Sequence, residues 1–280
     1  MARDLSVERI RDDRDHGSAQ LSLWALDVLH AGAKAADDWE DVATLARDLV
    51  AARPSMVVIE NRINRVMHAA DHTPEAVANE ARSVRTRAEH ADNAAATELD
   101  CLSGQTVFTL SRSGTVLAAL NHAPPARVIV AVSTPGGEGV RVAETLASAT
   151  KTTLVADAGI AQALAEFDVE YVVVGADTIL ADGSVVNKVG TRVAASAAYA
   201  LGIPFYAVCS LDKVSPRDGY DPEPRDAAEL YDGEADIDVS NPTFDRTPPD
   251  LVTGIATEAG LFDTGDVATI AVELRGLADW

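Results

Sequence analysis

The sequence predicts an α/β protein with a helical N-terminal domain, residues 1–103, and a C-terminal domain, residues 104–280, built on a doubly wound parallel sheet. Three observations predict this organisation. The first part carries helical periodicity and few strand-forming residues. In the second part, short apolar runs alternate with helical patterns. Those runs are apolar throughout, which indicates strands buried on both faces beneath covering helices.

The N-terminal helices are predicted, in order, from apolar residues that recur on one face. SAQLSLWALDVLHAGAKAA and DDWEDVATLARDLVAA each carry one such face. The proline in ARPSM ends the second helix, and Ile59, Ile63 and Met67 mark a third. Thr73 and Pro74 then open a long alanine-rich helix, because threonine caps a helix N-terminus and proline is favoured at the first helical position.

Five apolar runs predict the strands of the C-terminal domain: TVFTLS, RVIVAV, TTLVAD, YVVVGAD and PFYAVCS. Helices are expected to begin at Gly114, Glu138 and Thr191, with a short helix after the third run. In such a sheet the ligand crevice lies beyond the carboxyl ends of the strands. Polar or thiol side chains collect at these ends, namely Ser111, Arg112, Ser133, Thr134, Asp157, Asp177, Cys209 and Ser210. We therefore expect a binding site at this edge.

Residues 217–250 are acidic and rich in proline, and they predict a surface excursion before the last helices. Composition alone also permits disorder in this segment. Four apolar residues favour an ordered segment that they anchor to the body of the protein: Tyr231, Ile237, Val239 and Phe244.

The chain is strongly acidic, with 23 lysine and arginine residues against 44 aspartate and glutamate residues and a net charge of −21. Many carboxylates and few lysines suit a protein that stays hydrated in concentrated salt, so we expect a halophilic source. The sequence has no basic stripe, which argues against nucleic acid as a partner.

No apolar run approaches the ~18 residues that a membrane-spanning helix needs. The N-terminal stretch MARDLSVERIRDDRDHG also lacks the apolar centre of a signal peptide. We therefore expect a cytoplasmic protein without membrane contact. The two cysteines, Cys101 and Cys209, form neither a metal-ligand pattern nor a disulfide framework, so we expect no metal and no cofactor.

Three segments carry a family resemblance. GADTILADGSVVNKVGT resembles the signature G-A-D-x-I-x-x-[ND]-G-x-x-x-N-K-x-G-T of the family that contains the initiation factor 2B alpha, beta and delta subunits, methylthioribose-1-phosphate isomerase and ribose-1,5-bisphosphate isomerase. ARPSM is similar to the R-P-[ST] element of this family, and NPTFDRTPPDLVTGIATEAG to its N-P-x-F-[DE]-x-T-P segment. The resemblance covers nearly the whole chain. It implies a helical domain joined to a Rossmann-like domain, in a homodimer or higher homo-oligomer.

The resemblance also implies catalytic residues. The isomerases of the family resemble one another in a strand end T-x-C-[NS] and in the aspartate of G-A-D. Moving hydrogen between neighbouring carbons needs an acid and a base on opposite sides of the reacting bond. Asp177 matches the aspartate, whereas Ser111 occupies the position of the cysteine. A serine hydroxyl is a much weaker acid than a thiol and needs a separate base, so this position resembles the regulatory subunits.

Two further positions depart from the isomerases. Family members often carry E-[ST]-R-P after the second strand, where this chain has Val132 followed by Ser133, Thr134 and Pro135. The isomerases show R-G-A near the N-terminus, where this chain has His16, Gly17 and Ser18. Gly17 would let the backbone approach a phosphate, while Ser18 is also a good helix N-cap.

The pair Asn187 and Lys188 is the best ligand-binding candidate. Lysine is rare here, with four residues against 19 arginines, so a lysine indicates that a compact cation is needed at this position. Its partner is a ligand phosphate or the Asp177 carboxylate. Asp177 alone also fits a turn cap. The other ligand-binding candidates, each with a structural alternative such as an ion pair or a core position, are Arg53, Arg112, Gly17, Ser133 and Cys209.

Two functions follow from these residues. The first is a regulatory or non-catalytic protein, similar to the initiation factor 2B subunits, that retains a phosphosugar or nucleotide pocket and acts through protein partners. Ser111 and the altered strand end at Val132 favour it. The alternative is an aldose–ketose isomerase that acts on a phosphorylated pentose such as ribose 1,5-bisphosphate. In this alternative Asp177 is the general acid/base, Lys188 and Arg53 hold phosphate, and Ser111 or Cys209 is the second catalytic group.

Overall fold

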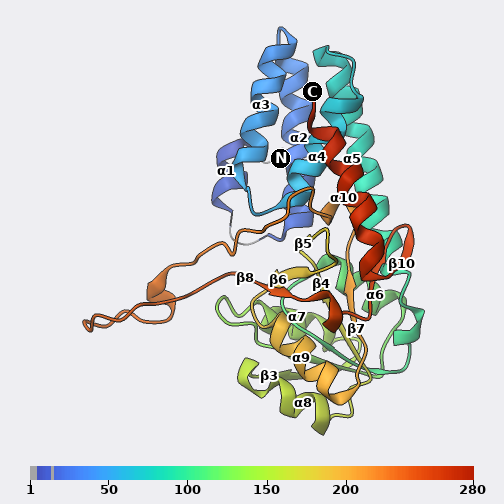
Figure 1. The fold of residues 1–280 in the computed structure, drawn as a ribbon, viewed down its shortest axis with the longest axis vertical. Helices are drawn as coiled ribbons and strands as arrows, with labels where there is room; N and C mark the ends of the chain where they lie inside the picture. Colours follow the sequence, from blue (N-terminus) through green and yellow to red (C-terminus); the bar gives the residue numbers. More distant parts are fainter. Residues whose placement is uncertain (1–4, 14–15) are drawn as a thin grey trace.

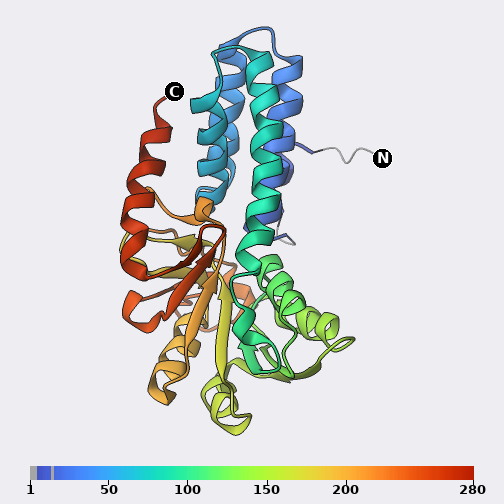
Figure 2. The ribbon, with the colours of Figure 1, turned by 90° about the vertical axis from the view of Figure 1, so that its right-hand side faces the viewer.

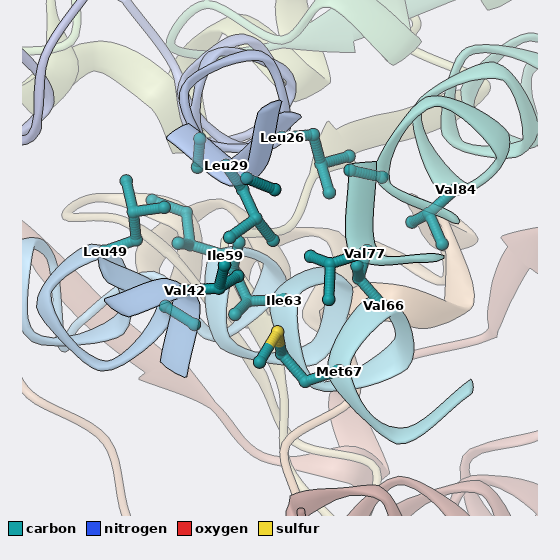
Figure 3. Packing of buried hydrophobic residues seen from close by; sticks show 14 of the residues in the cluster. Leu26, Leu29, Val42, Leu49, Ile59, Ile63, Val66, Met67, Val77 and Val84 are labelled. Carbon is teal, nitrogen blue, oxygen red and sulfur yellow. The ribbon is translucent and has the colours of Figure 1, made fainter. Parts of the chain in front are cut away.

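The computed structural model describes residues 5–13 and 16–280, with a helical part at one end and an α/β part at the other (Figure 1). The helical part comprises α1 (Val7–Asp12), α2 (Ser18–Ala35), α3 (Trp39–Ala52), α4 (Val57–Ala69) and α5 (Pro74–Ala96). The apolar faces predicted for these helices meet in one core, in which Leu29, Ile59 and Ile63 are fully buried (Figure 3). The predicted cap at Thr73 is confirmed, because its side chain accepts the N–H of Ala76.

A seven-stranded sheet forms the centre of the α/β part. In spatial order its strands are β10 (Gly260–Phe262), β9 (Gly254–Thr257), β7 (Phe205–Val208), β4 (Tyr171–Gly175), β1 (Thr106–Thr109), β2 (Arg127–Ala131) and β3 (Lys151–Val155). All neighbours pair in parallel except β10 and β9. The five predicted strands are confirmed as β1, β2, β3, β4 and β7.

Helices cover both faces of this sheet, which confirms the predicted fold class. On one face lie α6 (Gly114–His122), α7 (Glu138–Leu146) and the end of α5; on the other lie α8 (Ile160–Glu166) and α9 (Thr191–Leu201). Neighbouring strand residues divide between the faces: Val107 packs in the first cluster and Phe108 in the second. This alternation explains why the strands read as continuous apolar runs.

A second, three-stranded antiparallel sheet was not predicted. It consists of β5 (Thr178–Ile179), β6 (Val185–Lys188) and β8 (Phe244–Thr247), with β6 in the middle. A turn at Asp182 and Gly183 joins β5 to β6, and Gly183 has a φ of 81°. Such short strands leave little periodicity in the sequence, and β8 comes from far along the chain. The hairpin returns Lys188 to the carboxyl edge of the large sheet.

The acidic excursion projects as a long arm between η3 (Leu211–Lys213) and β8 (Figure 1). It contains one short helical turn, η4 (Ala227–Glu229). Phe244 is buried at its end, but Ile237 is 55% exposed, so the prediction that Ile237 anchors the segment is wrong. Acidic neighbours surround this residue in the sequence, and the arm offers it no apolar surface on which to pack.

One helix, α10 (Val267–Arg275), with the turn η7 (Gly276–Ala278), stands where several final helices were expected. The strands β9 and β10 occupy the rest of that stretch. Figure 2 shows α10 rising beside the helical part, and Trp280 donates from Nε1 to Asn64 Oδ1 at 3.0 Å. The boundary expected between residues 103 and 104 falls after η1 (Asp100–Leu102) and stays a prediction, because the C-terminus returns to the helical core.

Arg62 joins the two parts through a buried network. Its side chain is fully buried, and its guanidinium donates to Asp212 Oδ2 at 3.0 Å, Ser22 Oγ at 2.7 Å and Ser210 Oγ at 3.3 Å. The neighbouring Asn61 donates to the backbone carbonyls of Asp212 and Val214. Within the described ranges, no helix is long and apolar enough to cross a membrane.

Replacing this arginine tests the network. Arg62→Leu removes the fully buried partner of Asp212 and leaves it with Arg65, whose side chain is 38% exposed and whose Nε lies 2.7 Å from Asp212 Oδ1. We expect the free energy of unfolding to fall by about 3 kcal/mol, measured by urea denaturation in molar KCl. The control Arg87→Leu removes an ion pair with Glu80 whose arginine is 61% exposed, and it should change the stability by less than about 1 kcal/mol. Equal losses in both variants would contradict a special role for Arg62.

Candidate functional site

The large sheet has a topological switch point between β1 and β4. The chain passes from β1 through β2 to β3 at one side and then returns to β4 on the other side of β1. Ligands of open α/β sheets bind beyond the carboxyl ends of the strands at such a point. Ser111 follows β1 and Asp177 follows β4, so both candidate catalytic residues lie at this position.

A cavity of about 410 Å³ opens at this edge. This volume lies in the usual range of small-molecule sites, about 300–1,000 Å³. The helical part, the carboxyl edge of the sheet, the hairpin and the base of the arm all contribute to its wall. Six predicted site residues line it: Gly17, Arg53, Ser111, Arg112, Asp177 and Lys188. A narrower cavity of about 50 Å³ adjoins it, shares Ser111 and Asp177 with it, and is also lined by Asn187.

Asp177 connects the sheet edge to the helical part. Its Oδ1 accepts the hydroxyl of Ser18 at 2.7 Å, and its backbone N–H donates to the carbonyl of Val186 at 2.9 Å. Ser18 therefore does not cap α2 as the sequence suggested; Gly17 occupies the N-cap position, without a side chain to contribute. The Asp177 carboxylate lines both cavities, and in the part of the chain that the structure describes it accepts from Ser18 on α2 rather than from a backbone N–H of the following turn.

Lys188 is buried on β6 and is 4% exposed. Its Nζ donates to the carbonyl of Pro135 and forms an ion pair with Glu138 Oε1 at 3.1 Å. Within the protein, the carboxylate partner of Lys188 is therefore Glu138 and not Asp177, which was one of the two partners predicted from the sequence. Asn187 donates to Thr191 Oγ1 at 3.0 Å and so holds the start of α9.

Ser111 and Ser133 adopt left-handed backbone conformations at neighbouring strand ends, with φ values of 59° and 67°. The N–H of Ser111 donates to Ser133 Oγ at 2.7 Å, and the N–H of Ser133 donates to Asp157 Oδ1 at 2.7 Å. Such conformations cost about 1–3 kcal/mol each and persist only where neighbours enforce them. Ser133 is 1% exposed, so it supports Ser111 rather than meeting a ligand.

Arg53 lies between the helical part and the arm. It donates to the carbonyl of Asp13 at 2.7 Å and pairs with Glu223 Oε1 at 3.0 Å. This is the structural ion pair considered in the sequence analysis, and it lies at the wall of the cavity.

The expectation that Cys209 faces the ligand is wrong. Its thiol is 1% exposed and packs among apolar side chains from the sheet and α10. Burial raises the pKa of the Cys209 thiol to about 12. The pattern of an apolar strand that ends in cysteine also fitted a small core residue, and that interpretation is confirmed.

Sequence reasoning missed two charged residues of the site. Lys213 lines the narrower cavity and donates from Nζ to the carbonyl of Ala176, next to Asp177. The scarcity of lysine, used to select Lys188, would have selected Lys213 as well. Glu138 lines the larger cavity and starts α7. The sequence predicted Glu138 only as the start of a helix, and nothing local indicated its partners.

The larger cavity is locally cationic in a chain of net charge −21. Four carboxylates line it, namely those of Asp13, Glu138, Asp177 and Glu223. Five cationic side chains line it as well: Arg53, Arg112, Arg141, Lys188 and Arg225. An anionic ligand is therefore favoured here relative to the rest of the surface. Among the described residues, no group of three or more side chains is arranged to hold a metal ion.

The fold and the cavity define a class: a helical domain on a doubly wound α/β domain, with a polar cavity at the switch point. A model of the Initiation factor 2 subunit family matches residues 14–264. The chain belongs to this family, as its three motifs predicted.

Individual relatives agree over almost the whole chain. A ribose 1,5-bisphosphate isomerase from Archaeoglobus fulgidus is 31% identical, over 98% of this chain and 93% of its own. A methylthioribose-1-phosphate isomerase from Exiguobacterium sibiricum is 28% identical, over 95% of this chain and 87% of its own. The crystal structure of translation initiation factor eIF-2B from Pyrococcus horikoshii superposes with a TM-score of 0.81 and 27% identity, covering 92% of this chain and 95% of the other.

The different environments of the two cysteines predict their reactivity. Cys101 is exposed and Cys209 is buried. Because only the thiolate reacts, the raised pKa and burial of Cys209 should prevent its modification in the folded protein. We expect Ellman's reagent at pH 8 to label one thiol of the native chain and two after unfolding in guanidinium. Native Cys101→Ser should remain unlabelled, and rapid labelling of that variant would show that Cys209 is accessible.

Proposed function

We propose that this protein is an aldose–ketose isomerase that acts on a pentose phosphorylated at C1, such as ribose 1,5-bisphosphate. The observation that carries the proposal is the Asp177 carboxylate at the switch point, in a cavity with five cationic side chains. Two relatives that match nearly the whole chain are named as isomerases of sugar phosphates. These names favour the isomerase over the regulatory hypothesis that Ser111 suggested.

Asp177 has a defined task in this reaction. When protonated, it gives its proton to the ring oxygen as the bond between C1 and that oxygen breaks. The hydrogen on C2 then moves to C1 with its electron pair, and the C2 hydroxyl loses its proton to a base, which leaves a ketone. The atoms and electrons of substrate and product balance without a co-reactant. Ser18, which donates to Asp177 at 2.7 Å, fixes the orientation of the carboxyl group.

The arginines that line the larger cavity are the candidates for binding the phosphate groups of the substrate. Lys188 and Arg53 each form an ion pair with a glutamate. Much of their positive charge is therefore compensated within the protein and is not available to attract a ligand. Arg141 makes no ion pair with any described residue, and Arg112 lies beside Ser111 in both cavities. Arginine is suited to this task because its planar group binds phosphate through two hydrogen bonds.

A regulatory function is the second candidate, favoured by one observation. Ser111 stands where the resemblance places a cysteine, so a ligand can bind beside Asp177 without being converted. In that case the cavity senses a phosphorylated sugar or nucleotide, and the protein acts through protein partners. A homodimer or larger homo-oligomer fits both functions and stays a prediction, as do a halophilic source and a cytoplasmic location.

Turnover of ribose 1,5-bisphosphate to ribulose 1,5-bisphosphate by the purified protein in molar KCl tests the proposal. Asp177→Asn should lower kcat by about 10²–10⁴-fold, the usual contribution of general acid/base catalysis, because the amide cannot give up a proton. Asp250→Asn changes an exposed aspartate of the same domain and should leave kcat unchanged.

Binding measured by calorimetry separates the two candidate functions. A wild-type protein that binds the bisphosphate but does not convert it would reject the isomerase and support the regulatory candidate. Turnover that survives in Asp177→Asn would reject the role of that carboxyl group while leaving the activity in place.

A further inference from the structure

The position of Glu138 relative to the candidate catalytic residues follows from the strand order. Asp177 follows β4, Ser111 follows the neighbouring β1, and Glu138 follows β2 on the far side of β1. Adjacent strands lie about 4.8 Å apart, so β4 and β2 are separated by roughly 10 Å at this edge. A sugar bound over the end of β1 therefore meets Asp177 on one side and Glu138 on the other.

Glu138 makes two charged or polar contacts inside the cavity. Its Oε1 accepts the hydroxyl of Ser111 at 3.0 Å and pairs with Lys188 Nζ at 3.1 Å. It is also the first residue of α7, where the helix dipole favours a negative charge. Lysine and helix together stabilise the carboxylate. The hydrogen bond directs the Ser111 proton to Glu138 and leaves the lone pairs of the serine oxygen for a donor from the ligand.

The surrounding backbone holds this pair in place. The left-handed conformation of Ser111 is fixed through Ser133, whose own N–H is held by Asp157. A Cβ atom on Gly136 would lie 2.7 Å from Glu138 Oε2, so only glycine at this position lets the carboxylate lie where it does. Two unfavourable backbone conformations, at Ser111 and Ser133, and a glycine at position 136 thus surround the contact between Ser111 and Glu138. Such a concentration of strained backbone is typical of a functional site.

The geometry points to Ser111 and Glu138 as a joint acid/base group, with Glu138 as the base that the serine needs in place of a thiol. This inference rests on the proposed isomerase function. The C2 hydroxyl of the substrate gives its proton to Ser111 Oγ, and Ser111 gives its own proton to Glu138 Oε1. Asp177 protonates the ring oxygen on the other side. After each turnover, the proton on Glu138 returns to Asp177 through solvent, which restores the starting protonation states of both carboxyl groups.

Glu138→Gln is the first test, because glutamine keeps the size and the hydrogen bond but cannot take up a proton. We expect kcat on ribose 1,5-bisphosphate to fall by about 10²-fold or more, with a KM within about 3-fold of wild type. The limb of the pH profile that reports this carboxylate should disappear from the residual activity. Glu144→Gln, on the exposed face of the same helix, is the matched control and should behave as wild type.

Two double variants test the joint action of the pair. Ser111→Ala with Glu138→Gln should be no less active than either single variant, since residues that act as one unit are not additive. Ser111→Cys with Glu138→Gln should be at least tenfold more active than Glu138→Gln alone, because a thiol ionises without the glutamate. Its activity should also rise with pH toward the ordinary thiol pKa of about 8.5.

Distinct results overturn this inference and the proposed function. If wild type turns over and Glu138→Gln retains its activity, or the cysteine brings no recovery, the role of Glu138 is rejected while the isomerase stands. If the two single losses add in the double variant, the residues do not act together. If folded wild type binds the bisphosphate without turnover, the isomerase and the inference both fail.

Discussion

The buried guanidinium of Arg62 is the constraint on which the rest of the structure depends. A charge without solvent needs partners, and those of Arg62 come from both parts of the chain: Ser22 on α2, and Asp212 and Ser210 after β7. The partners of Arg62 therefore fix the position of the helical part relative to the sheet. Once these two parts meet in this way, the start of α2 lies against the carboxyl edge of the sheet, where Ser18 reaches Asp177.

The cavity is a consequence of that arrangement. Its floor is the strand ends at the switch point, but Gly17 and Arg53 belong to the helical part, and Glu223 belongs to the arm. The ion pair of Arg53 with Glu223 closes the wall between them. The geometry of a site assembled from three distant segments depends on the packing of the whole chain, and the ion pairs Arg53–Glu223 and Lys188–Glu138 hold these segments together at the cavity wall.

The sequence revealed the elements more reliably than their contacts. The large parallel sheet and the helix starts at Gly114, Glu138 and Thr191 follow from local periodicity and were predicted correctly. The small antiparallel sheet was missed because β5 has only two residues and because β8, which pairs with β6, comes from far along the chain. Site residues such as Ser111 and Asp177 were predicted by the rule for strand ends, and others such as Arg53 and Lys188 by the family resemblance and the scarcity of lysine. Their partners were not, since the pairs Ser18–Asp177 and Glu138–Lys188 join positions that only the folded chain brings together.

Ser111 in place of a cysteine favoured a non-catalytic protein, since an isolated hydroxyl is a poor acid and a poor base. In the folded protein, however, the Ser111 hydroxyl has a carboxylate as its hydrogen-bond partner. This hydroxyl donates to Glu138, which pairs with Lys188 and lies at the start of α7. A thiol can act as acid and as base by itself, whereas a serine hydroxyl needs a neighbouring carboxylate to accept its proton. In the proposed reaction, Ser111 at the cysteine position and Glu138 beside Lys188 therefore act together. The absence of a thiol from the sequence does not by itself define a non-catalytic member of the family.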